Sequence, residues 1–490
     1  MRILHVLPSI VFQISQLKGW LGIWGDLFFC FKGVRNSLLF FSVLFLLSLE
    51  SRGQVQRDLK GLAWEDDQYH QEPLKINYSV PVLNLPGATS LKSYCPRVVN
   101  QAGTNTAVSW ATVWYARTIL ESVACDSKDV KLNTQEAFNN FFNNRLVASN
   151  CAKPVSLIHV LRTLQLDGAV KFNKLKTFCL DTIPPDVMEM AKEHRISGFV
   201  RLFNSFDSRE VKVNAMKVAL VNKNPVVVGV ISPASLGKAI DYWQPKEAIE
   251  RGPGGHALCV IGYDDNKFGG AFEVVNSWGK DWGKEGYSWI RYEEVKDFVM
   301  YGFEPFDAHY SSCLEKNASA SLRFVKTDGT EMKALSVKPG NYKLEKAYPT
   351  KTEFRVVVNT TLQMYVYGIF ADPANAISPF FPWPGQNFTN AIPSSKFEFE
   401  LPLGNFPFTL EPPEGTNYLA FIFTSEPLDL TASLKSLQEA PGDFQQRLRS
   451  TFKNRSFGQS IQWQTEMKFN VDYDEEMFAV MVVRLDQTEQ

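Results

Sequence analysis

The hydrophobic period of the chain changes from helical to extended in its first two thirds. Long apolar and aromatic side chains recur at helical spacing over residues 106–123, which predicts a buried helix after the turn at 103–105. A second helix is expected at 155–166, ended by Gly168. From Pro225 onward the period falls toward two, and Gly- and Asp-rich turns separate four expected strands: 226–231, 256–263, 271–276 and 287–292. Helices first and antiparallel strands second indicate an α+β fold.

Beyond Tyr310 the pattern predicts a second, β-rich domain at 320–490. Proline-rich loops separate segments that alternate or are continuously apolar, and only 443–452 has a helical pattern. A β-sandwich is the natural interpretation. Its expected strands are 354–358, 363–370, 396–401, 418–423 and 477–485.

Composition excludes some classes of function. The 490 residues are 45% hydrophobic and carry 51 basic against 52 acidic side chains. A chain of this balance is folded, and it has no basic excess for binding nucleic acid. Its length favours two or three domains.

The most apolar segment, 38–49, has 12 residues, whereas a helix that spans a bilayer needs about 20. With Arg35 before it and Ser51 and Gly53 after it, the segment has the layout of a secretory signal cleaved before Gln54. The alternative is a membrane anchor formed by residues 38–49. Residues 1–33 do not fit a signal, and a start at Val34 would make them a gene-start error. Residues 54–79 are then expected to be a linker or N-terminal segment.

Removal of the signal leaves six cysteines, an even number compatible with disulfides in an exported chain. Six cysteines allow 15 pairings, and the sequence alone does not choose among them. No CxxC motif is present, so we expect no metal site, and we expect no cofactor. The six are Cys95, Cys125, Cys151, Cys179, Cys259 and Cys313.

The strongest chemical signal is GGHALCVIGYDD at 254–265, followed by GGAFEVVNSWGKDWGKEGYSWI at 269–290. These segments resemble the papain family of cysteine peptidases. The resemblance implies that His256 is the general base, that Asn276 orients it, and that Trp278 shields their contact from water. A base must lie within reach of the nucleophile, and a third group must fix the orientation of its ring.

The nucleophile is missing from the segment that should carry it. QAGTNTAVSWA at 101–111 resembles the start of the long helix in a bacterial branch of the family, with Gln101 at the oxyanion-hole position and Ala107 at the position of the catalytic cysteine. A methyl group cannot attack a carbonyl. We therefore expect a pseudopeptidase with a binding or scaffolding role. The alternatives are an active peptidase with a displaced nucleophile, for which Ser109 and Thr106 are the nearest hydroxyls, and an engineered Cys-to-Ala variant.

The resemblance also bears on the fold and on the substrate side. It implies a papain-like two-lobed fold over 80–306, with an N-terminal helical lobe and a C-terminal antiparallel β lobe, and a disulfide between Cys151 and Cys179. Two buried thiols are the alternative to that bridge. Where many relatives have a Gly-Gly pair after Cys151, this chain has Ala152 and Lys153, which weakens the expectation of extended-peptide binding.

Partners are expected only in outline. The cleft is the expected site for a peptide or protein ligand, with no nucleic acid and no stable membrane span after signal removal. The C-terminal domain resembles, more weakly, a bacterial domain of unknown function attached to exported peptidases. Its aromatic loop at 380–383 is either a contact surface or a loop folded over the end of the sandwich.

Overall fold

The computed structural model describes most of the chain from Gly61 onward. The expected signal sequence, the alternative anchor at 38–49 and the proposed start at Val34 lie outside the described residues. The residues that the structure describes are 61–75, 85–128, 137–306, 313, 317–383, 387–392, 399–402, 406–453, 455, 461–472 and 477–489.

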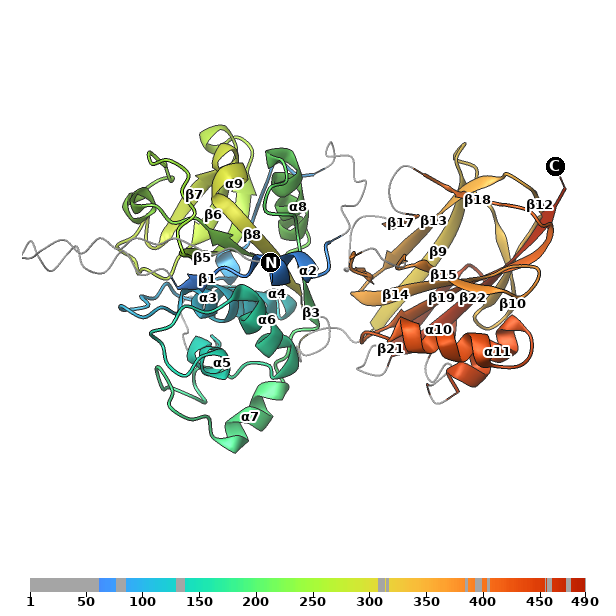
Figure 1. Ribbon diagram of the computed structural model, residues 1–490, viewed down its shortest axis with the longest axis horizontal. Helices are drawn as coiled ribbons and strands as arrows, with labels where there is room; N and C mark the ends of the chain where they lie inside the picture. The colour runs from blue at the N-terminus through green and yellow to red at the C-terminus, as the bar shows by residue number, and fades with distance from the viewer. Residues whose placement is uncertain are drawn as a thin grey trace, which may run out of the picture. The chain divides into compact units, whose positions relative to one another are not determined.

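A long buried helix leads the helical lobe, as the sequence predicts. It runs as α3 (Ala107–Ser109), a π-helical segment (Trp110–Arg117) and α4 (Thr118–Ala124). Side-chain caps start the two helices that follow, because Asn139 and Ser156 accept bonds from backbone N–H groups of their first turns. Figure 1 shows these helices together in one lobe. They are α5 (Asn140–Val147), α6 (Leu157–Leu166) and α7 (Pro185–Lys192).

The β lobe contains one antiparallel sheet in the order β3-β8-β4-β5-β6-β7, with β1 and β2 also paired to β5. All four strands expected from the sequence are present, and β5 is the long central one. Helices α8 (Arg209–Val221) and α9 (Tyr292–Phe298) belong to the same lobe (Figure 1). The strands are β1 (Leu62–Ala63), β2 (Ala88–Ser90), β3 (Gly198–Arg201), β4 (Val226–Val230), β5 (Gly254–Asp264), β6 (Ala271–Val275), β7 (Tyr287–Arg291) and β8 (Val299–Phe306).

The C-terminal region forms two sheets around one apolar core. One sheet has the order β10-β11-β22-β19-β14-β15, with β12 on β22 and β16 on β14; the other has the order β17-β13-β9-β21-β20, with β18 on β13. Their facing side chains make a common core that includes Phe324, Val356, Phe421 and Met481. The strands are β9 (Asn317–Lys326), β10 (Ala334–Lys338), β11 (Asn341–Leu344), β12 (Tyr348–Pro349), β13 (Glu353–Thr360), β14 (Met364–Ala371), β15 (Ile377–Phe381), β16 (Ala391–Ile392), β17 (Phe399–Leu401), β18 (Phe408–Thr409), β19 (Gly415–Thr424), β20 (Gln462–Trp463), β21 (Lys468–Asp472) and β22 (Phe478–Thr488).

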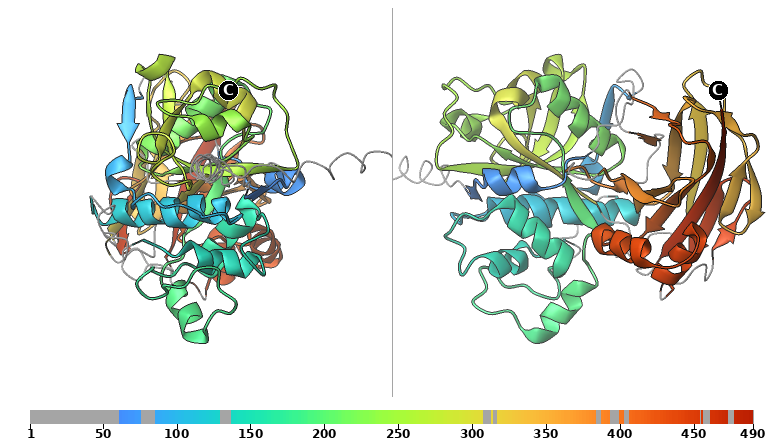
Figure 2. Two further views of the ribbon diagram at one scale, coloured as in Figure 1. Left: turned by 90° about the vertical axis from the view of Figure 1, so that its left-hand side faces the viewer. Right: turned by 45° about the vertical axis from the view of Figure 1, so that its right-hand side comes forward.

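The expectation of a single helix in this region is wrong. Besides α11 (Phe444–Thr451), which matches the predicted helix, α10 (Leu430–Glu439) begins at Asp429, whose carboxylate accepts a bond from Ala432 N. The two helices cover the outer face of the sheet that contains β14 and β19 (Figures 1 and 2). The α+β fold with a helical lobe, an antiparallel lobe and an additional β domain is otherwise confirmed.

Two disulfides are present. Cys151 and Cys179 are bridged, with Cα atoms 5.6 Å apart, which is the pair the resemblance implied. Cys125 pairs with Cys313, a bond that the sequence left open, and Cys95 and Cys259 are buried outside these bridges. Such bridges indicate an oxidising environment. Over the described part of the chain, no helix has the length and apolarity needed to cross a bilayer.

Candidate active site

His256, Asn276 and Trp278 form one buried cluster in the β lobe. His256 lies near the start of β5, opposite Val230 on β4, and Asn276 directly follows β6. His256 Nε2 lies 2.7 Å from Asn276 Oδ1, and the ring centroids of His256 and Trp278 are 4.3 Å apart. His256 and Asn276 are almost completely inaccessible to solvent. The structure therefore brings together the three residues that the motif singled out in this half of the domain.

The hydrogen bonds around Asn276 define the tautomer of His256. Asn276 Oδ1 also accepts a 2.7 Å bond from the backbone N–H of Ser277, which identifies this atom as the carbonyl oxygen. His256 Nε2 must then donate, which leaves Nδ1 as the acceptor of the neutral ring. Among the described residues Nδ1 has no hydrogen-bond partner. The imidazole is thus oriented as a base with its lone pair on Nδ1.

Burial keeps this imidazole neutral. It lowers the pKa of His256 to about 4, and the bond to Asn276 opposes that shift only in part. A neutral amide such as Asn276 orients the ring without supplying the negative charge that would favour an imidazolium. His256 therefore stays uncharged at neutral pH unless an anion forms beside it.

Ala107 lies at the first position of α3 and is fully buried. The nearest hydroxyls are committed to other contacts. Ser109 Oγ donates to Asn144 Oδ1 at 3.1 Å, and Thr106 Oγ1 lies 2.6 Å from Thr104 Oγ1. Neither hydroxyl is paired with His256.

Gln101 links the helical lobe to the turn that carries Asn276. Its Oε1 accepts a 2.7 Å bond from Ser277 Oγ, and its backbone N donates to Ser277 O at 2.7 Å. Its side-chain amide nitrogen donates to Thr104 O at 2.6 Å. One N–H of the expected oxyanion-hole amide is therefore engaged within the chain.

The N-terminal segment Gly61–Lys75, which we call the strap, enters this site. Within it, the short strand β1 (Leu62–Ala63) runs between the two lobes. Leu62 pairs with Gly255 on β5, and on its other side Ala63 N donates to Val155 O at 3.0 Å while Val155 N donates to Gly61 O at 3.2 Å. The described part of 54–79, expected to be a linker or N-terminal segment, is therefore hydrogen-bonded to both lobes.

The strap touches both halves of the site. A Cβ atom added to Gly61 would lie 2.7 Å from the backbone N of Ala107. The strap backbone therefore lies directly against the start of α3. The next residue, Leu62, is completely buried opposite Gly255, which precedes His256 in the chain. Gly61 thus contacts the start of α3, and Leu62 pairs with β5, the strand that carries His256.

Aromatic and ionic contacts fix the strap beyond this point. The Trp64 ring lies on Gly255, because a Cβ atom added to Gly255 would lie 2.3 Å from the ring. The same ring packs edge-on against Tyr301, with ring centroids 5.0 Å apart. Asp66 forms two bonds to Arg251, at 2.7 and 2.9 Å, and accepts a third from Tyr301. Tyr69 is buried and stacks on Tyr301 at 4.1 Å.

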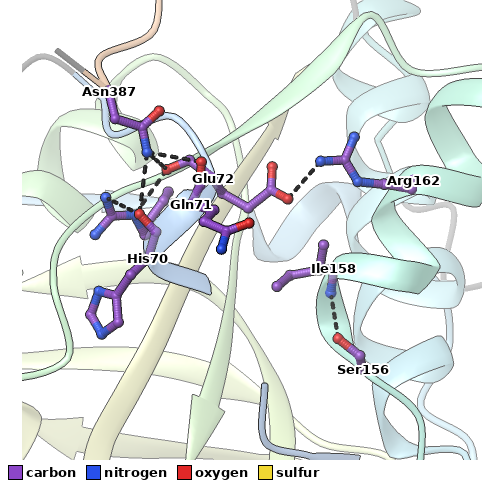
Figure 3. A network of polar contacts seen from close by, with 8 residues as sticks. His70, Gln71, Glu72, Ser156, Ile158, Arg162 and Asn387 are labelled. Carbon is purple, nitrogen blue, oxygen red and sulfur yellow. Dashed lines mark hydrogen bonds and ion pairs between the residues drawn. The ribbon is translucent and has the colours of Figure 1, made fainter. Parts of the chain in front are cut away.

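The end of the strap is held from two directions, as Figure 3 shows for its polar contacts. Asn387 of the C-terminal domain donates from its amide nitrogen to the backbone oxygens of His70, Gln71 and Glu72 at 3.2, 2.8 and 3.2 Å. Arg162 on α6 bonds to the Glu72 carboxylate at 2.7 Å. Helix α2 (Asp66–Gln71) is thereby joined at its C-terminal end to another domain.

The sequence indicated these candidate residues but not the segment that lies against them. The motif reasoning found the buried cluster, the helix start and the disulfide. It missed Leu62, Trp64 and Tyr69. The available signal was a short apolar run, Leu62–Trp64, followed by the acidic first turn of α2, a pattern too short for its period to identify a strand.

The described geometry is that of a two-lobed α+β protein with an oriented, buried His–Asn pair at the junction of its lobes. Residues 188–302 match the family model described as papain family cysteine protease. The matched range includes His256, Asn276 and Trp278, and it begins after Gln101 and Ala107.

A curated relative is 30% identical over 120 residues, the uncharacterized peptidase C1-like protein of Acanthamoeba polyphaga mimivirus. The match covers 23% of this chain and 38% of that protein, so the chain spans well under half the length of this relative.

Among solved structures, xylellain, a cysteine protease from Xylella fastidiosa, is 18% identical with a TM-score of 0.40, covering 52% of this chain and 98% of that one. Digestive procathepsin L2 proteinase from Tenebrio molitor larval midgut is 16% identical with a TM-score of 0.41, covering 56% and 95%.

Proposed function

We propose that this chain is a catalytically inactive papain-family protein with a binding or scaffolding role. The observation that carries the proposal is the methyl group of Ala107 at the start of the helix where the family places its nucleophile. Covalent catalysis needs an atom that can attack and then leave, and a methyl group has neither ability. His256 and Asn276 then remain as an oriented base with no acid to deprotonate.

The contacts of the neighbouring polar groups support the same proposal. An active peptidase with a displaced nucleophile would need a hydroxyl paired with His256, and Ser109 and Thr106 are bonded to Asn144 and Thr104 instead. An oxyanion hole needs free donors aimed at the developing charge, and one N–H of Gln101 is engaged by Thr104.

The strap limits how the cleft could bind a ligand. A peptide or protein ligand in the cleft, which the sequence led us to expect, would have to displace residues 61–64. The binding role therefore belongs either to surfaces outside the cleft or to a state in which the strap has left it. Export through an N-terminal signal and a bacterial origin are parts of the same proposal, and the two disulfides support export.

The decisive experiment treats the full-length protein with a peptidyl electrophile directed at active-site thiols, beside turnover of a fluorogenic peptide library. We expect no adduct and no turnover from the natural chain. The Ala107→Cys variant is the matched positive probe, because a thiol beside His256 at a helix start favours the thiolate. We expect this variant to gain slow but detectable thiol reactivity without full peptidase activity, since the strap and the engaged Gln101 remain.

Either of two results would contradict the proposal. A covalent adduct on the natural chain within 101–111, or steady turnover abolished by His256→Ala, would identify a working nucleophile. Rapid turnover by Ala107→Cys would show instead that Ala107 is the sole lesion and that the cleft accepts substrate.

A further inference from the structure

A cavity of about 580 Å³ opens at one end of the C-terminal sandwich, where its two sheets meet. Its volume lies within the range of small-molecule sites, roughly 300 to 1,000 Å³. Phe354 and Phe408 line it from one sheet, and Phe370, Phe380 and Leu419 from the other. The cavity therefore lies between the two sheets. Its lining residues belong to the C-terminal domain and not to the candidate active site.

The aromatic wall of the cavity is packed and preformed. Phe380 meets Phe408 edge-on at 5.4 Å and Phe421 at 5.3 Å, and Phe354 lies 5.6 Å from Phe408. Gly368 makes room for this arrangement, because a side chain there would begin 2.3 Å from the Phe380 ring. A rigid wall of this kind loses little conformational freedom when a ligand binds.

The mouth of the cavity offers an exposed aromatic ring. Trp383 is 53% exposed although it lines the same cavity. Within the expected aromatic loop at 380–383, Phe380 and Phe381 belong to β15 and are buried, whereas Trp383 remains open to solvent. An accessible indole is the best aromatic partner for a cation.

The polar lining is acidic on balance. Asp372 and Glu411 contribute carboxylates, and among the described residues that line the cavity none is Lys, Arg or His. Asn417 and Gln487 add amides that are bonded to each other at 3.1 Å. Charge complementarity therefore favours a ligand with a positive group, and the walls favour an apolar body.

We propose that this cavity is a binding site for a small organic cation with an aromatic or branched aliphatic body. The apolar body packs against Phe354, Phe380 and Phe408 inside the cavity. The ammonium or guanidinium group lies at the mouth, over the face of Trp383 and within reach of the Glu411 carboxylate. The site is independent of the strap and of the missing nucleophile.

The test is isothermal titration of the full-length protein with three probes of one shape and different charge: 4-phenylbutylammonium, 4-phenylbutanol and 4-phenylbutyrate. We expect the cation to bind most tightly and the carboxylate most weakly, with a preference that falls as salt is added. Trp383→Ala should weaken binding of the cation about fivefold to thirtyfold. Glu411→Gln should reduce the preference for the cation over the alcohol, because it removes a negative charge from the lining of the cavity.

Two variants serve as matched controls. Phe206→Ala removes an even more exposed aromatic ring from the peptidase-like domain, and Glu439→Gln removes an exposed carboxylate from α10. Neither should change binding of any probe. Equal affinity for the three probes, absence of binding at millimolar concentration, or equal loss in Phe206→Ala and Trp383→Ala would each overturn the proposal.

Discussion

The charge of His256 depends on its surroundings rather than on an acidic partner. Its ring lies between the Trp278 indole and the Asn276 amide, both uncharged, and water is excluded. The pair was predictable because both residues lie at strand ends separated by one hairpin, so a local pattern fixes their approach. The strap, which pairs with the strand beside them, lies almost two hundred residues earlier in the chain. No local sequence pattern reveals that pairing.

A first prediction is that acid destabilises the protein through His256. Its pKa is about 4 in the folded chain and about 6.5 in the unfolded chain, so between these values the unfolded state binds a proton that the folded state excludes. The contribution of neutral His256 to the free energy of unfolding is therefore fully present above pH 6.5 and is lost as pH falls toward 4. The loss at pH 4.5 should be about 2 to 3 kcal/mol.

Urea unfolding at pH 7.5 and pH 4.5 measures this difference. The control is His256→Gln, which keeps a polar group and cannot titrate in this range. Its decrease in unfolding free energy between the two pH values should be smaller than that of the natural chain by the same 2 to 3 kcal/mol. Identical decreases in both proteins would mean that His256 is not held neutral.

A second prediction concerns access to position 107. A thiol introduced by Ala107→Cys should react slowly with iodoacetamide, because Ala107 is fully buried beneath Gly61. Adding Trp64→Ala removes the ring that packs on Gly255 and Tyr301 and should raise the labelling rate at least about tenfold, since about 1.4 kcal/mol of opening free energy changes the open population tenfold.

Peptide mapping of 101–111 by mass spectrometry distinguishes this site from the buried Cys95 and Cys259. Trp64→Ala with Ala107 retained is the control and should give no adduct in that peptide. If Ala107→Cys labels equally fast with and without Trp64, the strap does not shield the site.

The position of the strap depends on two glycines, Gly61 in the strap and Gly255 on β5. Gly61 and Gly255 let its backbone approach α3 and its Trp64 ring approach β5, and a side chain at either position would begin less than 3.0 Å from other atoms. A sequence pattern of three apolar residues cannot specify pairing with strands far along the chain. The missed helix α10 has a different cause. Its leucines follow a helical period, but exposed polar residues dominate the segment.

A third prediction is that Gly61→Ala displaces the strap. The added methyl would meet Ala107 N and Asn105 O, which are backbone atoms and cannot rotate away. We expect the unfolding free energy to fall by about 1 to 3 kcal/mol and hydrogen exchange across 61–75 to accelerate. Gly87→Ala is the matched control, because open space surrounds that position. Unchanged exchange in Gly61→Ala would show that the strap does not lie against α3.

At the scale of the molecule, the sequence separates the domains but cannot describe how they are joined. The change from mixed to purely β patterning near residue 310 was readable, and both regions have their own cores. The contacts between the two domains are ordinary hydrogen bonds and apolar packing, which occur on every protein surface. Tyr365 OH donates to Ser197 O at 3.2 Å, and Val200 and Phe306 pack among side chains of the C-terminal sheet. Such contacts have no period and no motif, so only the fold reveals them.

The last prediction tests whether the C-terminal domain stabilises the strap. Leu74 is bridged on one side to Arg201 and on the other to Phe388, so the strap end is a strand shared by two domains. Asn387→Ala removes the donor for three backbone oxygens at the end of α2, and the expected loss of unfolding free energy is about 1 kcal/mol. Exchange at 70–75 should accelerate, because the carbonyls of this turn lose their partner.

Asn390→Ala is the matched control for this substitution. Its side chain donates to Val366 O and also bonds to Tyr367, both in the C-terminal domain, so it should cost similar stability without changing exchange in the strap. Faster exchange at 70–75 in Asn387→Ala alone would mean that the C-terminal domain helps to keep the cleft filled. Equal behaviour of the two variants would mean that the strap is held by the peptidase-like domain by itself. The distinction matters for function, because a partner that binds the C-terminal domain near Asn387 could release the strap only in the first case.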